Sequence, residues 1–241
     1  MRVQPDMRIE IWSDVVCPWC YVGKRRLETA LAGFEHADQV EVVYRSFELD
    51  PSAPAHGQEL STPVIARKYG RSEAEMRQMQ QQLVDLAAEE GLAFRIFETV
   101  HTNTVDAHRV LHLALETGGA ALQRELKEAL LAAYFLDARN VGDHDVLTEV
   151  ADAAGLEEAR VREVLAGTEY ADAVEADIAQ ARAYGATGVP FFVVDQKYGV
   201  SGAQPAGVFS QVLEQAWTES HPVLQTVGGD AEACGPDGCA I

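Results

Sequence analysis

The sequence predicts a mixed α/β fold in which a small strand-containing unit is interrupted by a large helical segment. Strand patterns occur near both ends of the chain, and the long stretch between them has apolar residues at helical spacing. We therefore expect three parts: a discontinuous α/β domain (residues 1–51 and 185–221), a helical insertion (52–184) and a flexible C-terminal tail (222–241).

Composition and charge exclude several classes of protein. With 241 residues, of which 47% are hydrophobic, the chain is long enough to bury a substantial core. Its net charge of −19 argues against partners such as nucleic acid or an anionic membrane, whose phosphates would repel it. No apolar run reaches the roughly 18 residues of a membrane span, and the first residues lack the apolar core of a secretory signal. We expect a cytoplasmic protein.

The first of two cysteine pairs lies where a strand pattern changes to a helical one. Residues 8–16 alternate as in a strand, and residues 40–49 form a second strand pattern. Between them, an apolar stripe at helical spacing begins at Cys20. Pro18 suits the first position of this helix, which places Cys17 at the N-cap and Cys20 one turn later on the buried face.

This placement predicts a redox-active pair, because cytoplasmic thiols are kept reduced and a structural disulfide is not expected there. Free amide groups and the helix dipole at a helix N-terminus stabilise a thiolate, so we expect a lowered pKa for Cys17. Cys20 is expected to be shielded but close enough to attack a mixed disulfide on Cys17. A buried structural pair and half of a zinc site are the alternatives.

Residues 185–203 supply the second half of the α/β unit. Two glycines end a helix, and Val189–Pro190 leads into an apolar strand pattern over 191–194, a turn and a second short strand. Residues 204–217 have the periodicity of a closing helix. Pro190 either shapes a turn in the usual trans form or is a functional cis-proline.

The middle of the chain predicts helices without a fixed repeat. They cover residues 72–91, 104–118, 121–135, 143–155, 156–167 and 170–185. Met76 and Met79 lie at core spacing in the first of these helices, which favours a role as core filler over a peptide-binding surface.

Several motifs together resemble a known family. The segments SDVVCPWCYVGKRRLE, GVPFFVV and SGAQP, with the long helical insertion between them, are similar to a DsbA-family thiol oxidoreductase with a thioredoxin-like fold. The nearest resemblance is to the FrnE-like branch, the polyketide-associated dithiol–disulfide isomerases. It spans residues 8–219. The dipeptide between the cysteines is Pro-Trp, where the periplasmic oxidant has Pro-His.

The resemblance implies roles for particular residues. Cys17 is the attacking thiol, Cys20 the resolving thiol and Pro190 a cis-proline opposite the attacking sulfur. Val189, whose backbone would pair with an extended substrate, and Trp19 are the candidate substrate-binding residues. The implied partners are protein or small-molecule disulfides or dithiols and a thiol electron donor or acceptor. No cofactor is implied beyond the redox-active disulfide, with glutathione as an open alternative.

Several polar residues have two interpretations each. Asp14 either accepts the proton of the resolving thiol, as buried acids do in related folds, or closes the strand and caps the turn. His101, Asn103, His108 and Arg109 either border the cleft or form a helix cap with a solvated face.

Three classes of function remain open. The favoured class is a thiol–disulfide oxidoreductase or isomerase. The second is a glutathione-dependent isomerase or transferase of the 2-hydroxychromene-2-carboxylate isomerase or kappa type. Those proteins more often carry serine where Cys17 stands, so the complete CxxC favours the first class. The third is a non-enzymatic chaperone that binds peptides through the helical insertion.

The tail contains the second cysteine pair, Cys234 and Cys239, around a Gly-Pro-Asp-Gly turn sequence. The chain between Pro222 and Cys234 extends to about 40 Å at most, whereas a compact chain of this size has a radius of gyration of about 18 Å. The tail is therefore long enough to approach Cys17. We expect a relay pair that exchanges electrons with Cys17 and Cys20; a local disulfide and a metal clip are the alternatives.

Thiol trapping tests this relay. In a Cys20→Ser variant, a mixed disulfide on Cys17 cannot be resolved by its usual partner. We therefore expect a bridge from Cys17 to Cys234 or Cys239, detected by peptide mass spectrometry after an acid quench. If neither bridge forms over a range of redox buffers, the relay hypothesis is wrong.

Overall fold

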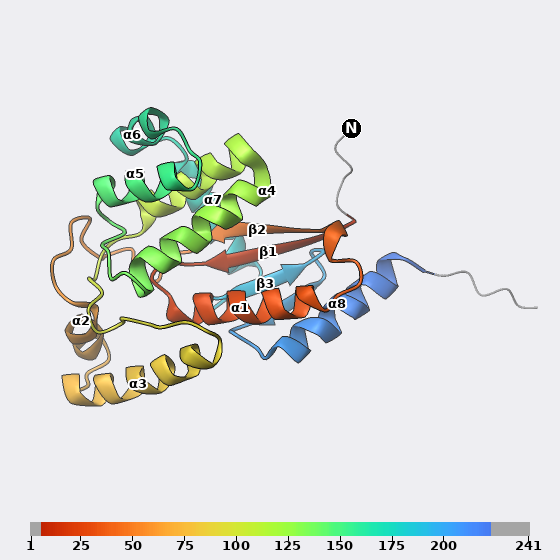
Figure 1. Ribbon diagram of the computed structural model, residues 1–241, viewed down its shortest axis with the longest axis horizontal. Coiled ribbons are helices and arrows are strands. Elements are labelled where there is room, and N and C mark those ends of the chain that lie inside the picture. Colours follow the sequence, from red (N-terminus) through yellow and green to blue (C-terminus); the bar gives the residue numbers. More distant parts are fainter. Residues whose placement is uncertain (1–5, 223–241) are drawn as a thin grey trace, which may run out of the picture.

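The computed structural model describes residues 6–222 and contains a four-stranded sheet with helices on both faces (Figure 1). The strand order is β2-β1-β3-β4, and the strands are β1 (Met7–Ser13), β2 (Val40–Ser46), β3 (Phe191–Val194) and β4 (Tyr198–Ser201). Strand β1 is parallel to β2 and antiparallel to β3, and β3 is antiparallel to β4. The sheet therefore joins the two ends of the α/β domain expected from the sequence, and the fold class is confirmed.

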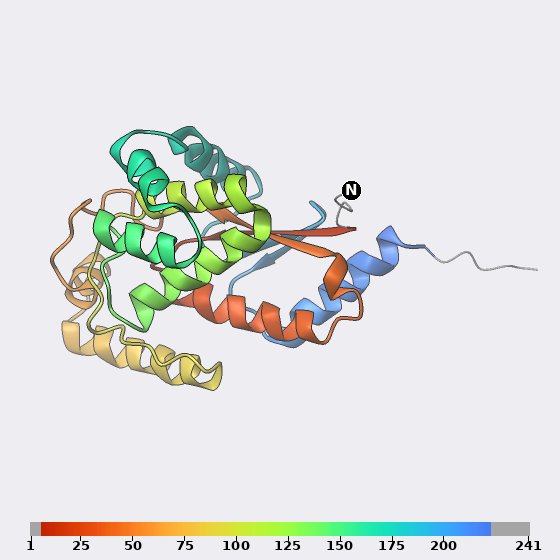
Figure 2. The same cartoon turned by 45° about the horizontal axis from the view of Figure 1, so that its top comes forward.

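Helices α1 (Pro18–Ala32) and α8 (Ala206–Ser220) cover one face of the sheet (Figures 1 and 2). Alternate strand residues point toward these helices because successive side chains of a strand face opposite sides. Ile9, Ile11 and Phe192 pack there against Leu27 of α1, together with Phe209 and Leu213 of α8. This apolar layer fixes α1 against the sheet and so positions the cysteines at its N-terminus.

Helix α7 (Ala171–Ala183) packs on the opposite face. The indole Nε1 of Trp12 donates to the carbonyl oxygen of Asp177 at 2.7 Å, and the Asp177 carboxylate accepts the backbone N–H of Ser46 at 2.8 Å. Asp177 of the insertion thus bonds to the central strand β1 and to the edge strand β2, which ties the helical segment to the sheet.

The other helices of the insertion are α2 (Ser61–Lys68), α3 (Glu73–Glu89), α4 (Val105–Phe135), α5 (His144–Ala153) and α6 (Glu158–Ala166). Helix α4 lies beside β2, where the Gln123 side chain accepts from the backbone N–H of Tyr44 at 2.8 Å and donates to its carbonyl at 2.9 Å. It is interrupted at Gly119, whose φ of 71° and ψ of −167° are not helical. This break corresponds to the two separate helices expected from the sequence, and a glycine adopts such angles without strain from a Cβ.

Some boundaries differ from the sequence expectation. Strand β1 ends at Ser13 rather than at residue 16, because the Cys17 N–H bonds to the Asp14 carbonyl and closes a turn before α1. Strand β2 ends at Ser46, and helix α2 was not expected. Helix α3 begins as its sequence indicates, with a reciprocal capping box between Ser72 and Glu75.

Two further expectations from the sequence concern membrane-spanning segments and the second cysteine pair. Within residues 6–222, no helix is both long and apolar enough to cross a bilayer. Cys234 and Cys239 lie outside the described residues, so their relay role stays a prediction.

Gly23 of α1 touches the loop that precedes β3. A Cβ added there would lie 3.1 Å from Cγ of Pro190 and 3.2 Å from Cζ of Phe192, whereas one added at Gly207 of α8 would meet nothing within 4 Å. We expect Gly207→Ala to raise the free energy of unfolding by about 0.5–1 kcal/mol through helix propensity. Gly23→Ala should lower the free energy of unfolding by about 1 kcal/mol or more, because the steric conflict of the new Cβ with Pro190 and Phe192 exceeds the gain in helix propensity. Urea denaturation measures both; equal gains would contradict close packing at Gly23.

Candidate active site

The cysteine pair occupies the first turn of α1, as the sequence predicted. Cys17 is the N-cap with φ −94° and ψ 112°, and Pro18 is the first helical residue. The Cys20 N–H donates to the Cys17 carbonyl at 3.0 Å, which starts the helix. Both cysteines are only 3% exposed and neither is in a disulfide. The two thiols thus lie side by side beneath the surface, joined by a hydrogen bond.

A second segment completes the site from the far end of the chain. The Val189–Pro190 peptide bond is cis, as expected from the resemblance. The Cys17 thiol donates to the Val189 carbonyl at 3.5 Å across 172 residues of sequence. Trp19 lies beside them, 43% exposed. The structure therefore brings together the five residues that sequence reasoning placed at the centre of the site, and their chemical roles stay predictions.

The two thiols titrate as a pair, and their interaction moves their pKa values apart. The hydrogen bond with Cys20, followed by burial, raises the pKa of Cys17 well above its usual value. Burial also opposes ionisation of Cys20, but the hydrogen bond with Cys17 and the charge of Lys127 lower the pKa of Cys20. The sequence expectation considered the helix amides alone and predicted a lowered pKa for Cys17. The Cys20 N–H does act in that direction on Cys17, but the second thiol and burial outweigh it.

Asp14 lies directly before the pair and is 1% exposed. Its Oδ2 accepts the Leu49 N–H at 2.8 Å, and its Oδ1 lies 3.4 Å from Nε2 of the equally buried His108. Burial alone would raise the pKa of Asp14, but His108 and the Leu49 N–H lower it below its usual value. A carboxylate with a lowered pKa is a weak proton acceptor. The bond from Leu49 links the end of β1 to the segment after β2, and both interpretations of Asp14 from the sequence stay predictions.

Lys127 is the site residue that sequence reasoning missed. It lies on α4, is fully buried, and its Nζ donates to the Ser13 carbonyl at 3.3 Å. Burial lowers its pKa to about 8, against the opposing effects of Cys20 and Asp14. No signal in the sequence indicated its burial, because the stripe of residues 123, 127, 130 and 134 that the structure buries begins with two polar side chains, Gln123 and Lys127.

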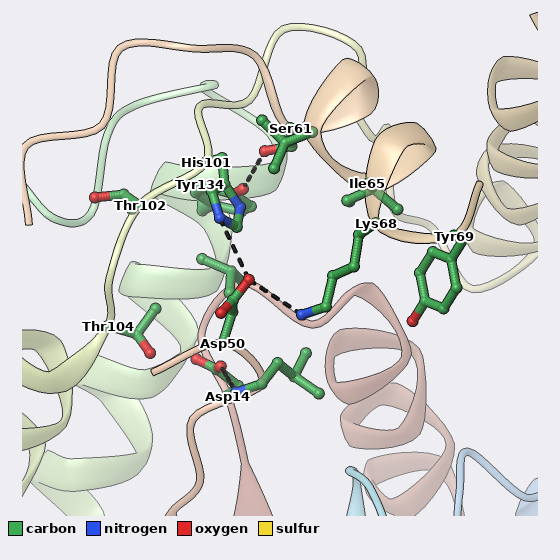
Figure 3. A pocket seen from close by; sticks show the side chains of 13 residues that line it. Asp14, Asp50, Ser61, Ile65, Lys68, Tyr69, His101, Thr102, Thr104 and Tyr134 are labelled. Atoms are coloured by element: carbon green, nitrogen blue, oxygen red, sulfur yellow. Dashed lines mark hydrogen bonds and ion pairs between the residues drawn. The ribbon is translucent and has the colours of Figure 1, made fainter. Parts of the chain in front are cut away.

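The polar cluster expected from residues 101–109 divides between different environments. His101 lines a pocket of about 160 Å³ that also reaches Asp14 (Figure 3). In this pocket Asp50 accepts from Lys68 at 3.1 Å and lies 3.5 Å from the His101 ring. Arg109 instead is buried away from the pocket and donates to the carbonyls of Val164, Gly167 and Glu169. Of this cluster, His101 borders the pocket near Asp14, whereas Arg109 holds the C-terminal end of α6.

An apolar groove of about 530 Å³ begins at the cysteine loop. Its rim includes Trp19, Tyr69 and Met79, which are exposed, and Met76 lies deeper and is buried. The interpretation of both methionines as core filler is therefore wrong for Met79, which is 48% exposed. Met79 lines this groove from helix α3.

The fold and the site together define a class of protein. A CxxC at the start of the helix that follows β1, beside a cis-proline that precedes β3, is the arrangement of a thioredoxin fold, here with helices inserted between β2 and β3. The chain belongs to the family of DSBA-like thioredoxin domains, whose profile matches residues 8–214.

Individual relatives agree with this assignment. The chain is 28% identical over 218 residues to the uncharacterised protein YwbO of Bacillus subtilis strain 168, covering 86% of this chain and 96% of YwbO. It is 51% identical to the probable DsbA oxidoreductase SCO1869 from Streptomyces coelicolor, whose crystal structure superposes with a TM-score of 0.84 over 98% of this chain and 99% of that one. The cytosolic disulfide reductase DsbM from Pseudomonas aeruginosa, solved with GSH, shares the fold at 14% identity and a TM-score of 0.57, over 87% and 98% of the two chains. These relatives support an oxidoreductase or isomerase role in general.

Replacement of Asp14 by asparagine tests the buried charge. Because the folded state lowers the pKa of Asp14, its carboxylate stabilises the fold above its usual pKa of 3.8, and this contribution is lost as the pH falls through the lowered value. We expect Asp14→Asn to reduce the free energy of unfolding by about 1–3 kcal/mol at pH 7 and to approach wild type in acid.

Urea denaturation at pH 7 and near pH 3 measures this difference. Asp195→Asn is the matched control, because the Asp195 carboxylate also accepts a backbone N–H, that of Arg8 at 2.7 Å, from a half-buried position. It should change stability by less than about 1 kcal/mol. A loss for Asp14→Asn that is equally large at both pH values would show that the charge of Asp14 contributes nothing.

Proposed function

We propose that this protein is a dithiol oxidoreductase or isomerase that exchanges disulfides with polypeptide or small-molecule substrates in the cytoplasm. The observation that carries the proposal is the position of Cys17, at the start of α1 with its sulfur 3.5 Å from the carbonyl of Val189. A substrate strand that pairs with the backbone at Val189 would place its disulfide next to Cys17. The motifs that resemble the FrnE-like branch support placement in that branch.

The exchange proceeds in two balanced steps. Cys17 must first lose its thiol proton, which its raised pKa makes the demanding part of this step. Its thiolate then attacks one sulfur of the substrate disulfide, which forms a mixed disulfide and releases the first substrate thiolate. The Cys20 thiolate then attacks the Cys17 sulfur, which forms the Cys17–Cys20 disulfide and releases the second substrate thiolate. Two electrons pass from the protein to the substrate, and a thiol donor restores the reduced pair. Isomerisation results when the freed substrate thiolate attacks a different disulfide of the same substrate and a substrate thiolate then displaces Cys17 from the mixed disulfide, so that no net electrons are transferred.

The groove beside the cysteines favours substrates with apolar groups near the sulfur. Trp19 belongs to both the cysteine loop and the groove rim, so a substrate bound at Cys17 is in reach of Tyr69 and Met79. The exposed rim residues offer aromatic and thioether contacts that adapt to varied side chains. This supports unfolded polypeptides as substrates. Glutathione is the proposed thiol donor, consistent with the GSH complex of DsbM.

Insulin reduction with dithiothreitol or glutathione tests the proposal. We expect the wild type to accelerate the reaction and Cys17→Ser to lose at least about 100-fold of that rate, because no other thiol takes its position. A Cys234→Ser/Cys239→Ser variant is the matched control for cysteine removal and should retain the exchange step at Cys17.

Other outcomes favour the other classes of function. Turnover that requires glutathione and survives Cys20→Ser would indicate the glutathione-dependent isomerase or transferase class. Full protection of an unfolding client by a cysteine-free variant, without redox activity in the wild type, would indicate a chaperone.

A further inference from the structure

The polar pocket beside the cysteine turn contains charges that the exchange steps above do not use. Besides hydroxyl groups, its lining includes three charged side chains and an imidazole, those of Asp14, Asp50, Lys68 and His101 (Figure 3). Val16, the residue before the attacking cysteine, lines the pocket as well. A ligand in this pocket therefore lies against the turn that leads to the attacking sulfur.

Asp50 and Lys68 present opposite charges side by side in this pocket. Nζ of Lys68 donates to Oδ2 of Asp50 at 3.1 Å, and Nε2 of His101 lies 3.5 Å from the same oxygen. Hydrogen bonds from Ser52 to the other oxygen hold the pKa of Asp50 below its usual value, so this carboxylate is charged at neutral pH. The Lys68 side chain is 48% exposed, and an ion pair as open as this one adds little to stability. The pair is thus open to a ligand.

The pocket has unused bonding capacity for both kinds of charge. An ammonium group has three donors, and in the part of the chain that the structure describes, Nζ of Lys68 uses one of them, toward Asp50. Asp14 adds a second carboxylate to the lining, and its pKa is lowered by its hydrogen bonds although burial opposes this. Two carboxylates and one ammonium leave an excess of negative charge, which favours a ligand with an ammonium group of its own.

The ligand that matches this arrangement carries an ammonium and a carboxylate close together. Its ammonium would pair with Asp50, and its carboxylate would accept from Lys68 and from the His101 ring. An α-amino acid head group has both charges on one carbon atom. The pocket of about 160 Å³ is large enough for it, because a cavity of about 150 Å³ accepts a benzene ring.

We propose that this pocket binds the α-amino acid head group of a small-molecule thiol or disulfide, with Asp50 next to the ammonium and Lys68 next to the carboxylate. This rests on the proposed function and names a class of small-molecule substrate for Cys17. The head group belongs either to the reacting half-cystine itself, as in cystine, or to a γ-linked glutamate, as in glutathione. Asp50 and Lys68 are then specificity-determining residues, supplied by the segment after β2 and by α2.

A series of small disulfides tests the pocket, because each is reduced to two thiols as Cys17 and Cys20 form their disulfide. L-cystine and oxidised glutathione carry complete head groups, diacetylcystine lacks the ammonium, cystamine lacks the carboxylate and hydroxyethyl disulfide lacks both. All proteins carry Cys234→Ser and Cys239→Ser, and each rate is divided by the rate of the same disulfide with dithiothreitol to remove intrinsic reactivity. We expect at least one complete head group to react at least about tenfold faster than hydroxyethyl disulfide on this corrected scale.

Variants of the pocket assign the two charges. Lys68→Met should lower the ratio of cystine or glutathione disulfide to hydroxyethyl disulfide by about fivefold or more, and Asp50→Asn should do the same for the ratio of cystamine to hydroxyethyl disulfide. Arg67→Met is the matched control, because Arg67 precedes Lys68 on α2 but pairs with Glu59 at 2.7 Å outside the pocket. It should leave all rates within about twofold of wild type. A loss confined to one of the two complete disulfides identifies which head group the pocket binds.

Binding without chemistry separates the pocket from the exchange reaction. S-methyl-L-cysteine and S-methylglutathione carry the same head groups, but their thioethers cannot form disulfides. Calorimetric titration should show saturable binding of at least one of them, weakened about fivefold or more by Lys68→Met and unchanged by Arg67→Met. Absence of saturable binding of both thioethers to the wild type overturns the proposal.

The remaining outcomes are also decisive. Wild-type ratios in both Lys68→Met and Asp50→Asn overturn the proposal. If these variants do not fold, as judged by circular dichroism, the wild-type series decides: cystamine and diacetylcystine must both react more slowly than the preferred complete disulfide on the corrected scale, and equal rates overturn the proposal. If Cys17→Ser reduces hydroxyethyl disulfide as fast as the wild type does, the proposed exchange fails, which is a different result from failure of the pocket to bind the thioethers.

Discussion

The antiparallel pairing of β1 with β3 is the constraint on which the site depends. Its register sets Trp12 opposite Phe191, so Pro190 lies at the same end of the sheet as the turn that leads to Cys17. The pairing is held from one side by the apolar layer under α1 and α8, and from the other by α7. Cys17 thus meets the Val189 carbonyl although 172 residues separate them. A shift of one residue would turn every side chain of β3 to the other face and remove this contact.

The titratable side chains beneath the cysteines come largely from a different part of the chain than the cysteines themselves. Asp14 follows β1, but His108 and Lys127 come from the two halves of α4 in the insertion. The break at Gly119 lets both halves of the helix approach the same region from different directions. Buried charges rarely improve stability over apolar packing. Around the two sulfurs these charges act in opposite directions: Lys127 lowers the pKa of Cys20, whereas Asp14 raises that of Cys17.

The surroundings of the pair divide into a polar and an apolar side. The polar pocket leads from Asp14 to Asp50, Lys68 and His101 (Figure 3), whereas the apolar groove leads from Trp19 along α3. Both are lined by Val16, Ser61, Ile65, Tyr69 and Tyr134. Both depend on helix α2, a short element that the sequence pattern did not reveal.

The sequence alone determined the local features of this protein: the strand-to-helix junction at Cys17, the proline at the first helical position, the apolar stripes of the helices and the order of the elements. These follow from interactions between residues that are near in the chain, which leave periodic patterns. The tertiary structure alone decided the pKa order of the two thiols, the burial of Lys127 and His108, and the exposure of Met79. Each of these depends on groups brought together from distant segments, and one side chain's environment cannot be read from the spacing of its sequence neighbours.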